Sequence, residues 1–173
     1  MAYHFFVMYL LKELTELDKN IGSFVLRSII HSTIYAVNIV SQHPKELSTI
    51  GSQCCEIFEK LVSLITTFPS VGTELASSLP FLALNLTNLC SKEVAEAGLV
   101  RRLIVILETI VCMPKDDMNQ FALITAVAEL DSFPDNKKFS KLNGHLKEEK
   151  AKQPSLSVEN VSEKLISLFL FFC

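Results

Sequence analysis

The sequence predicts an all-α fold, and three observations lead to that prediction. Apolar residues recur at spacings of three and four along most of the chain, as they do on one face of a helix. Short breaks that contain Gly, Pro, Asn or Asp separate these stretches. Runs that alternate apolar and polar residues and end in hairpin dipeptides do not occur in the sequence, so no strand is needed.

The apolar stripes predict six long helices. Their expected ranges are 3–17, 23–42, 45–67, 73–90, 91–113 and 117–130. The breaks expected between the first four are Asn20 to Gly22, Pro44 and the turn from Phe68 to Gly72. Pro114 should end the fifth helix, because proline lacks the amide that the helix interior requires.

Capping residues support two of these helices. Thr73 is expected to be the N-cap of the fourth, and Pro80 should kink that helix or split it in two. Asp117 should open the sixth helix, with Gln120 three residues later reaching back as in a capping box.

The last quarter of the chain has a different character. The stretch 131–143 reads DSFPDNKKFSKLN, which predicts a loop that carries a short helix, and a polar helix should follow at about 142–152. Pro154 breaks this helix, and an apolar helix is expected from about 158. The predicted organisation is therefore helical repeats over 1–130, a polar loop and short charged helix over 131–154, and an apolar terminal helix over 155–173 that is expected to be truncated.

Two arrangements of these helices remain open. The evenly spaced breaks favour a HEAT-like helical solenoid, in which antiparallel helix pairs of about 40–47 residues stack on one another. The alternative is an irregular helical bundle.

Composition restricts the partners. The chain has 173 residues, of which 49% are hydrophobic and 20% are charged, so some apolar surface is expected to meet a partner or to cause self-association through the apolar ends. With 19 acidic and 16 basic residues spread through the sequence, no surface of positive potential for direct nucleic-acid binding is predicted. No apolar segment reaches the roughly 18 residues of a membrane span, and no signal peptide is expected.

Catalytic, cofactor and metal sites are not predicted. The five cysteines include no CxxC pair and lie among apolar residues, as in a reduced protein of the cytoplasm or nucleus. The five glycines form neither a GxGxxG nor a phosphate-binding loop, and the four histidines lie far apart. Two Ser-Gln dipeptides, at Ser41 and Ser52, occur about as often as chance allows.

Arg101 and Arg102 are the most unusual charged residues, because they lie in an otherwise apolar helix. They are candidates for an interaction: an ion pair with a neighbouring helix, or contact with a partner. The simpler interpretation is that both arginines lie along the surface with their charged ends in water.

Several short motifs resemble a known family. They are Tyr3 to Val7 before Leu10, Phe24-Val25-Leu26-Arg27, Cys54-Cys55, and Leu130-Asp131-Ser132-Phe133-Pro134-Asp135 with Phe139 after it. In order and spacing they are similar to the helical solenoid of the ataxia-telangiectasia mutated (ATM) branch of the phosphatidylinositol-3-kinase-like protein kinases. The similar part extends from about Tyr3 to Phe139 and would precede the FAT and kinase domains of such a protein.

The resemblance implies a non-catalytic segment of a large Ser/Thr protein kinase of the DNA double-strand-break response, in the nucleus or cytoplasm. The chain contains no kinase glycine-rich loop, catalytic loop or Asp-Phe-Gly motif, so none of the catalytic residues of that family can be assigned here. Its partners would be other proteins or the remainder of a larger kinase chain. Two alternatives remain: a free-standing HEAT-type adaptor, and a small helical enzyme or carrier, which would need polar side chains around one pocket.

Overall fold

A computed structural model describes residues 2–13, 19–66, 68–92, 97–112 and 120–152, and within these ranges helices joined by short turns are its only regular secondary structure. The prediction of an all-α fold is therefore confirmed. The elements are α1 Ala2–Glu13, α2 Lys19–Gln42, α3 Ser48–Ser63, α4 Pro69–Ser77, α5 Leu79–Cys90, α6 Ala97–Cys112, α7 Gln120–Ser132, the 3-10 turn η2 Asn136–Phe139 and α8 Ser140–Lys152.

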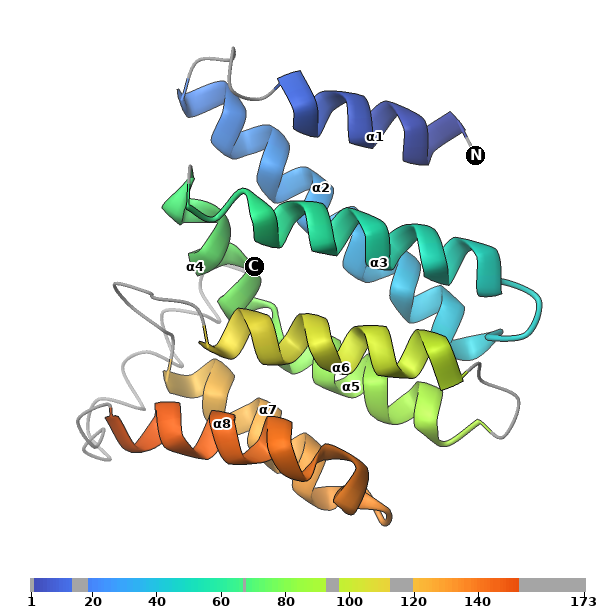
Figure 1. Cartoon of the computed structure of the whole chain (residues 1–173), viewed down its shortest axis with the longest axis vertical. Helices are drawn as coiled ribbons and strands as arrows, with labels where there is room; N and C mark the ends of the chain where they lie inside the picture. Colours follow the sequence, from blue (N-terminus) through green and yellow to red (C-terminus); the bar gives the residue numbers. More distant parts are fainter. Residues whose placement is uncertain (1, 14–18, 67, 93–96, 113–119, 153–173) are drawn as a thin grey trace, which may run out of the picture.

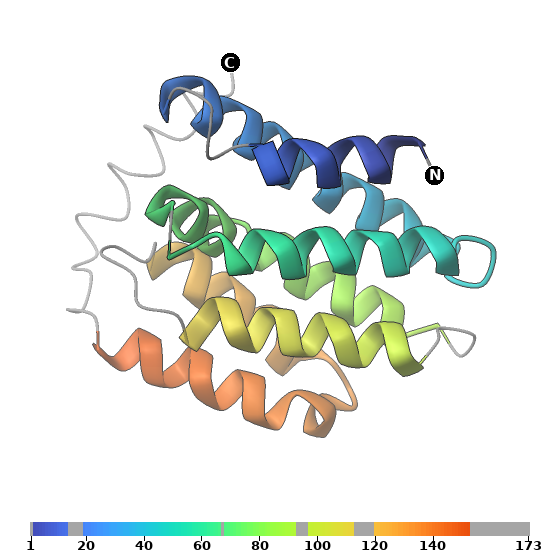
Figure 2. The same cartoon turned by 45° about the horizontal axis from the view of Figure 1, so that its top comes forward.

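The helices form two layers (Figures 1 and 2). One layer contains α1, α3, α6 and α8, and each of these helices contacts the next in that order. The other layer contains α2, α5 and α7, with α4 leading into α5, and α5 contacts both α2 and α7. Contacts of α2 with α3, α5 with α6 and α7 with α8 join the layers, so the chain alternates between them from α2 onward.

The hydrophobic core lies between the layers. Its largest fully buried side chains come from most of the helices: Leu11, Ile30, Ile57, Phe58, Leu61, Leu75, Leu79, Leu82, Leu86, Leu89 and Phe139. Each such side chain contributes roughly 1.5–3 kcal/mol relative to an exposed position. The apolar spacing of three and four that predicted the helices is the pattern that directs one face of each helix into this core.

The boundary before α2 differs from the prediction. Asn20 to Gly22 were expected to separate two helices, but α2 already begins at Lys19 and includes them. A glycine inside a helix costs only about 1 kcal/mol relative to alanine, which the packing of a 24-residue helix can offset. The predicted end of the first helix near residue 17 lies outside the described residues.

The turn predicted from Phe68 to Gly72, and Thr73 as an N-cap, are also wrong. Helix α4 begins at Pro69, which occupies its first turn, so Gly72 and Thr73 lie within the helix. Proline fits the first helical position because its fixed φ is already helical and its missing amide would have no partner there. Pro69 was expected to end one helix, but it begins the next.

Pro80 splits the predicted fourth helix, as expected. Helix α4 ends at Ser77, and α5 begins at Leu79 with Pro80 in its first turn. Ser78 joins them with φ −88° and ψ −4°, and its hydroxyl donates a 2.9 Å hydrogen bond to the carbonyl of Glu74. The break allows α4 to contact α2 and α6 while α5 continues along the core.

The remaining predicted boundaries differ from the structure or lie outside the described residues. The fifth helix was expected from Ser91, but α6 begins at Ala97, whereas the cap at Asp117 and the apolar terminal segment 155–173 lie outside the described residues. The stretch 131–143 contains the end of α7, η2 and the start of α8. Phe139 of η2 is fully buried, with its ring centroid 5.4 Å from that of Phe133, so this polar stretch is fastened to the core.

Contrary to the expectation from the sequence, one helix among the described residues meets the length and composition of a membrane span. Phe24–Gln42 of α2 has a mean hydropathy of 1.3, and 39% of that window is buried within the protein. Leu26, Ile29, Ile30, Val37 and Val40 provide much of that hydropathy and are all buried. A core helix of a two-layer array passes the same test of length and composition, and α2 packs against α3, α4 and α5 in this way.

Replacement by alanine should have opposite effects on stability at Gly51 and at Gly144. A Cβ at Gly51 would lie 2.8 Å from Leu99 Cδ2 and 3.1 Å from Val40 Cγ1, whereas one at Gly144 would meet nothing within 4 Å. Gly144→Ala should raise the free energy of unfolding by roughly 0.5–1 kcal/mol. Gly51→Ala should lower it by about 1 kcal/mol or more, because Leu99 must move from its packed position. Urea denaturation measures both, and an equal gain for the two variants would contradict the close approach of α2, α3 and α6.

Candidate functional site

Arg102 joins α6 to α3 through a bidentate ion pair. Its Nε and Nη2 donate hydrogen bonds of 3.0 Å each to the two carboxylate oxygens of Glu59. Its Nη1 donates a third hydrogen bond, of 2.9 Å, to Ser52 Oγ. Hydrogen bonding to Glu59 raises the pKa of Arg102 above its ordinary value. Each of the three guanidinium nitrogens thus donates a hydrogen bond to a residue of the neighbouring helix.

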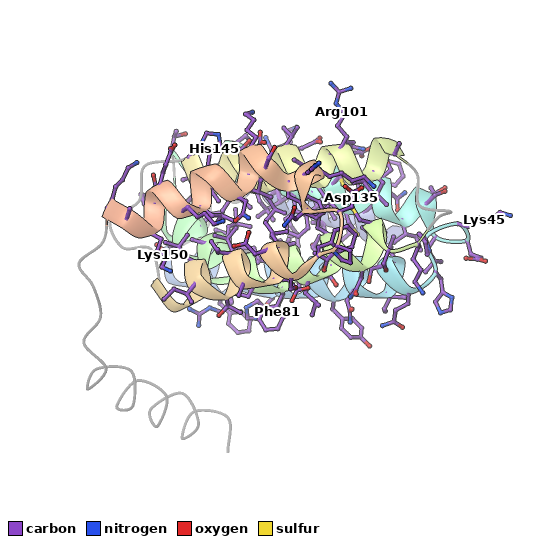
Figure 3. All side chains as sticks on the ribbon, turned by 90° about the horizontal axis from the view of Figure 1, so that it is seen from below. Lys45, Phe81, Arg101, Asp135, His145 and Lys150 are labelled. Carbon is purple, nitrogen blue, oxygen red and sulfur yellow. The ribbon has the colours of Figure 1, made fainter. Side chains whose placement is uncertain are left out.

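Arg101 has a different position although it is the next residue. Successive residues of a helix point about 100° apart, so the two arginines cannot share one direction. Figure 3 shows the Arg101 side chain extending away from the outer face of the layer that contains α6. It is exposed, and no ion pair is formed by it with any residue that the structure describes.

A shallow groove of ≈ 290 Å³ runs between α3 and α6 beside the two arginines. Its lining consists of Glu59, Val62, Arg101, Arg102, Val105, Ile106 and Thr109. Val105 lies one turn after Arg101 and is 53% exposed. The Thr109 hydroxyl donates a 2.7 Å hydrogen bond to the carbonyl of Val105, so it is already used within the helix.

The sequence analysis singled out Arg101 and Arg102 but missed the α3 residues that face them. Ser52 and Glu59 are seven residues apart and therefore lie on one side of α3, two turns from each other. That spacing was visible in the sequence, but the pairing with Arg102 joins residues 43 and 50 positions apart and needs the topology.

Similar polar contacts join the other helices of this layer. His4 Nε2 of α1 lies 2.9 Å from Glu56 Oε2 of α3, and Lys141 Nζ of α8 donates a 2.7 Å hydrogen bond to Glu108 of α6. Each contact bridges two helices that are neighbours in space and not in sequence. Together with Arg102 and Glu59 they cross all three helix boundaries of the layer.

The opposite outer face, formed by α2, α5 and α7, has few charges and several exposed apolar side chains. Helix α5 has no charged residue at all, and its Phe81 is 61% exposed. In Figure 3 the labelled Phe81 lies on the side of the molecule away from Arg101. The exposed apolar side chains on this face are Phe24, Tyr35, Ile39, Phe81, Leu84 and Ile124.

Polar contacts within this second layer are few. Arg27 of α2 pairs with Glu74 of α4, and its Nε donates a 2.9 Å hydrogen bond to Glu74 Oε1. Thr87 of α5 donates a 2.7 Å hydrogen bond to Glu129 of α7. These two contacts engage most of the described charges of the layer, which leaves its outer face mainly apolar and neutral.

Cys54 and Cys55 are buried in α3 and point to different sides of it. Burial raises the pKa of the Cys54 thiol to about 11 and that of Cys55 to about 12. Thiols with such values are poor nucleophiles and poor metal ligands at neutral pH. Among the described residues, no group of three or more His, Cys, Asp or Glu is placed to hold a metal ion.

The two Ser-Gln dipeptides differ in accessibility. The Ser41 side chain is buried at the end of α2, and its hydroxyl donates a 2.7 Å hydrogen bond to the carbonyl of Asn38. Ser52 is half-buried and accepts the hydrogen bond from Arg102. Phosphorylation of Ser41 in the folded chain would therefore require local opening of the helix end.

No protein-family model, curated protein or solved structure matches the chain. The assignment of a function therefore depends on the residues and the geometry described above.

Because Arg102 and Glu59 contact each other directly, a double-mutant cycle of Arg102→Ala and Glu59→Ala should give a coupling of about 0.5–1 kcal/mol. The coupling should shrink in about 1 M salt, which screens partly exposed charges. The matched cycle of Arg101→Ala with Glu59→Ala should give a coupling near zero. Equal couplings in the two cycles would show that the adjacent arginines are not distinguished as described.

Thiol accessibility gives a second prediction. Iodoacetamide at about pH 8 should modify exposed Cys112 rapidly, and it should modify Cys54 and Cys55 only as fast as the protein opens. Peptide mass spectrometry after timed quenching would assign each site. Rapid modification of Cys54 or Cys55 under native conditions would contradict their burial in α3.

The thiols of Cys54 and Cys55 should also make the free energy of unfolding depend on pH. Their pKa values are raised in the folded state, so the stability that they contribute is complete below about pH 9 and is lost as the pH rises toward 11 or 12. A variant with Cys54→Ala and Cys55→Ala should show a shallower loss of stability over that window, measured by urea denaturation at each pH.

Proposed function

We propose that this chain is a non-catalytic scaffold and forms a segment of a HEAT-like helical solenoid. The observation that carries the proposal is the order of contacts. Helices two or three positions apart in the sequence lie side by side within a layer, and the pairs α2 with α3, α5 with α6 and α7 with α8 connect the layers. Stacked helix pairs have this order, and such arrays bind partners along extended faces.

Exposed aromatic side chains on α1 support the proposal that the chain is a segment of a longer array. Helix α1 contacts α3 on one side, and on its other sides it exposes Phe5, Phe6 and Tyr9 by 68%, 59% and 61%. In a stack of helix pairs, apolar side chains at such a position are covered by the neighbouring pair. Left in water, each forgoes roughly 25 cal/mol per Å² of apolar area.

At the opposite end of the described array, α8 has a polar outer surface. Lys141, Lys147, Glu148 and Lys150 are exposed on it, while Leu142 and Leu146 face the core. The two ends of the array therefore differ, and the aromatic surface of α1 is the one that favours a further helical neighbour.

The resemblance to the ATM branch of the phosphatidylinositol-3-kinase-like kinases gives this scaffold its most specific proposed context. The chain would then hold and connect other parts of a large nuclear or cytoplasmic kinase and would perform no phosphoryl transfer itself. The raised pKa values of the buried thiols Cys54 and Cys55 and the shallow form of the groove between α3 and α6 favour a scaffold over a small helical enzyme. A free-standing HEAT-type adaptor is the second candidate, and the reading frame that surrounds this sequence in its transcript would distinguish the two.

Sedimentation of the purified chain tests the proposal. At roughly tens of micromolar the chain should self-associate, because no residue that the structure describes covers the exposed aromatic side chains of α1. Replacing Phe5, Phe6 and Tyr9 together by Ser should reduce the association, and the single replacement Phe81→Ser on the opposite layer should reduce it less. A monomeric wild-type chain that unfolds cooperatively would contradict the proposal, and so would phosphate transfer from ATP to a Ser-Gln peptide.

A further inference from the structure

We infer that the groove between α3 and α6 is a docking site for a partner helix that presents a glutamate and a leucine four residues apart. This inference rests on the proposed scaffold function and names the partner chemistry at one of its faces. It follows from the charge and the apolar surface of the groove that are not used by contacts within the protein.

Arg101 provides the charge of the site. The residues three and four positions before and after Arg101 on α6 are not acidic, so none of these neighbours on its own helix can pair with it. They are Ala97, Gly98, Ile104 and Val105. Across the groove, both carboxylate oxygens of Glu59 accept hydrogen bonds from Nε and Nη2 of Arg102. The groove thus carries one net positive charge that is not neutralised by any residue the structure describes.

Several other cations on this side of the molecule are already paired. Lys138, Lys141, Lys147 and Lys152 each have a carboxylate within 3.0 Å, from Asp135, Glu108, Asp131 and Glu149 respectively. Arg101 differs from them because it has no such carboxylate and because it borders an apolar groove. An arginine in that position can bind a carboxylate through two parallel hydrogen bonds.

Val62, Val105 and Ile106 provide the apolar part of the site. Val105 lies four residues after Arg101, which is a rise of about 6 Å along α6. A partner helix that runs beside α6 with its glutamate on Arg101 would place a residue four positions away over Val105 at the same rise. An aliphatic side chain there would bury the exposed part of Val105.

The size of the groove fits side chains of a peptide better than a cofactor. Its ≈ 290 Å³ lies at the lower limit of typical small-molecule sites. Its polar groups other than Arg101 are engaged: Glu59 by Arg102, and the Thr109 hydroxyl by the carbonyl of Val105. The neutral aromatic face of α2, α5 and α7 lacks a comparable free charge, so it indicates no partner of defined chemistry.

Three labelled helical peptides test the inference by fluorescence anisotropy. They share an Ala and Gln background with a Leu, and four residues before the Leu they have Glu, Gln or Lys. The chain should bind the Glu peptide at least about tenfold more tightly than the Gln peptide. Arg101→Glu should remove this preference and favour the Lys peptide. Val105→Ser should bind the Glu peptide more weakly than the unchanged chain does.

Lys150→Glu is the matched control, because Lys150 is an exposed cation on α8 away from the groove, as Figure 3 shows. It should leave the preference for the Glu peptide intact. Circular dichroism should show the same helical signal for each variant, since both substituted charges are exposed. Equal binding of the Glu and Gln peptides, no binding of any peptide, or an equal loss in Arg101→Glu and Lys150→Glu would each overturn the inference.

Failure of this inference would be distinguishable from failure of the scaffold proposal. Self-association through α1 is measured by sedimentation without any peptide and does not depend on Arg101. If the chain self-associates as expected but the Glu peptide does not bind, only the groove loses its assignment.

Discussion

The two helical layers depend on one another, because neither can keep its inner face in water. Phe58 and Leu61 of α3 are fully buried, as are Leu82 and Leu86 of α5 on the other layer. Helix α5 has no charged residue, and α2, α6 and α7 contact it and cover most of its apolar side chains. The split at Pro80 and the close approach at Gly51 permit these helices to cover each other.

Apolar burial alone does not determine how one helix lies along the next, because it has little directionality. Polar contacts between the helices supply direction. Arg102 fixes α6 against two points of α3, Ser52 and Glu59, that are two turns apart. Asp131 of α7 likewise accepts hydrogen bonds from Asn143 and Lys147 of α8. Such partly exposed contacts contribute little stability, about 0.2–1 kcal/mol each, so their main effect is on alignment.

The sequence predicted the helices well because their apolar periodicity is a local property. It failed at Gly22 and Pro69, where the same residue type is compatible with the end of a helix or with its first turns. The break at Pro80 was easier to predict, because a proline inside a long apolar stretch must interrupt the hydrogen bonding of the helix. Local signals could therefore place the helices but could not decide these two boundaries.

The candidate site was only half visible in the sequence for a related reason. Two adjacent arginines in an apolar helix are conspicuous, but the sequence could not show that Arg102 pairs with Glu59 while Arg101 does not, because that depends on how α3 lies against α6. The pairing has a consequence for recognition. Arg102 neutralises Glu59, which is the only carboxylate among the described residues that line the groove, and so leaves Arg101 as the uncompensated charge of that lining. The contact that aligns the two helices is thus the same one that gives the groove its preference for an acidic partner, whereas the neutral face of the other layer can select by shape alone.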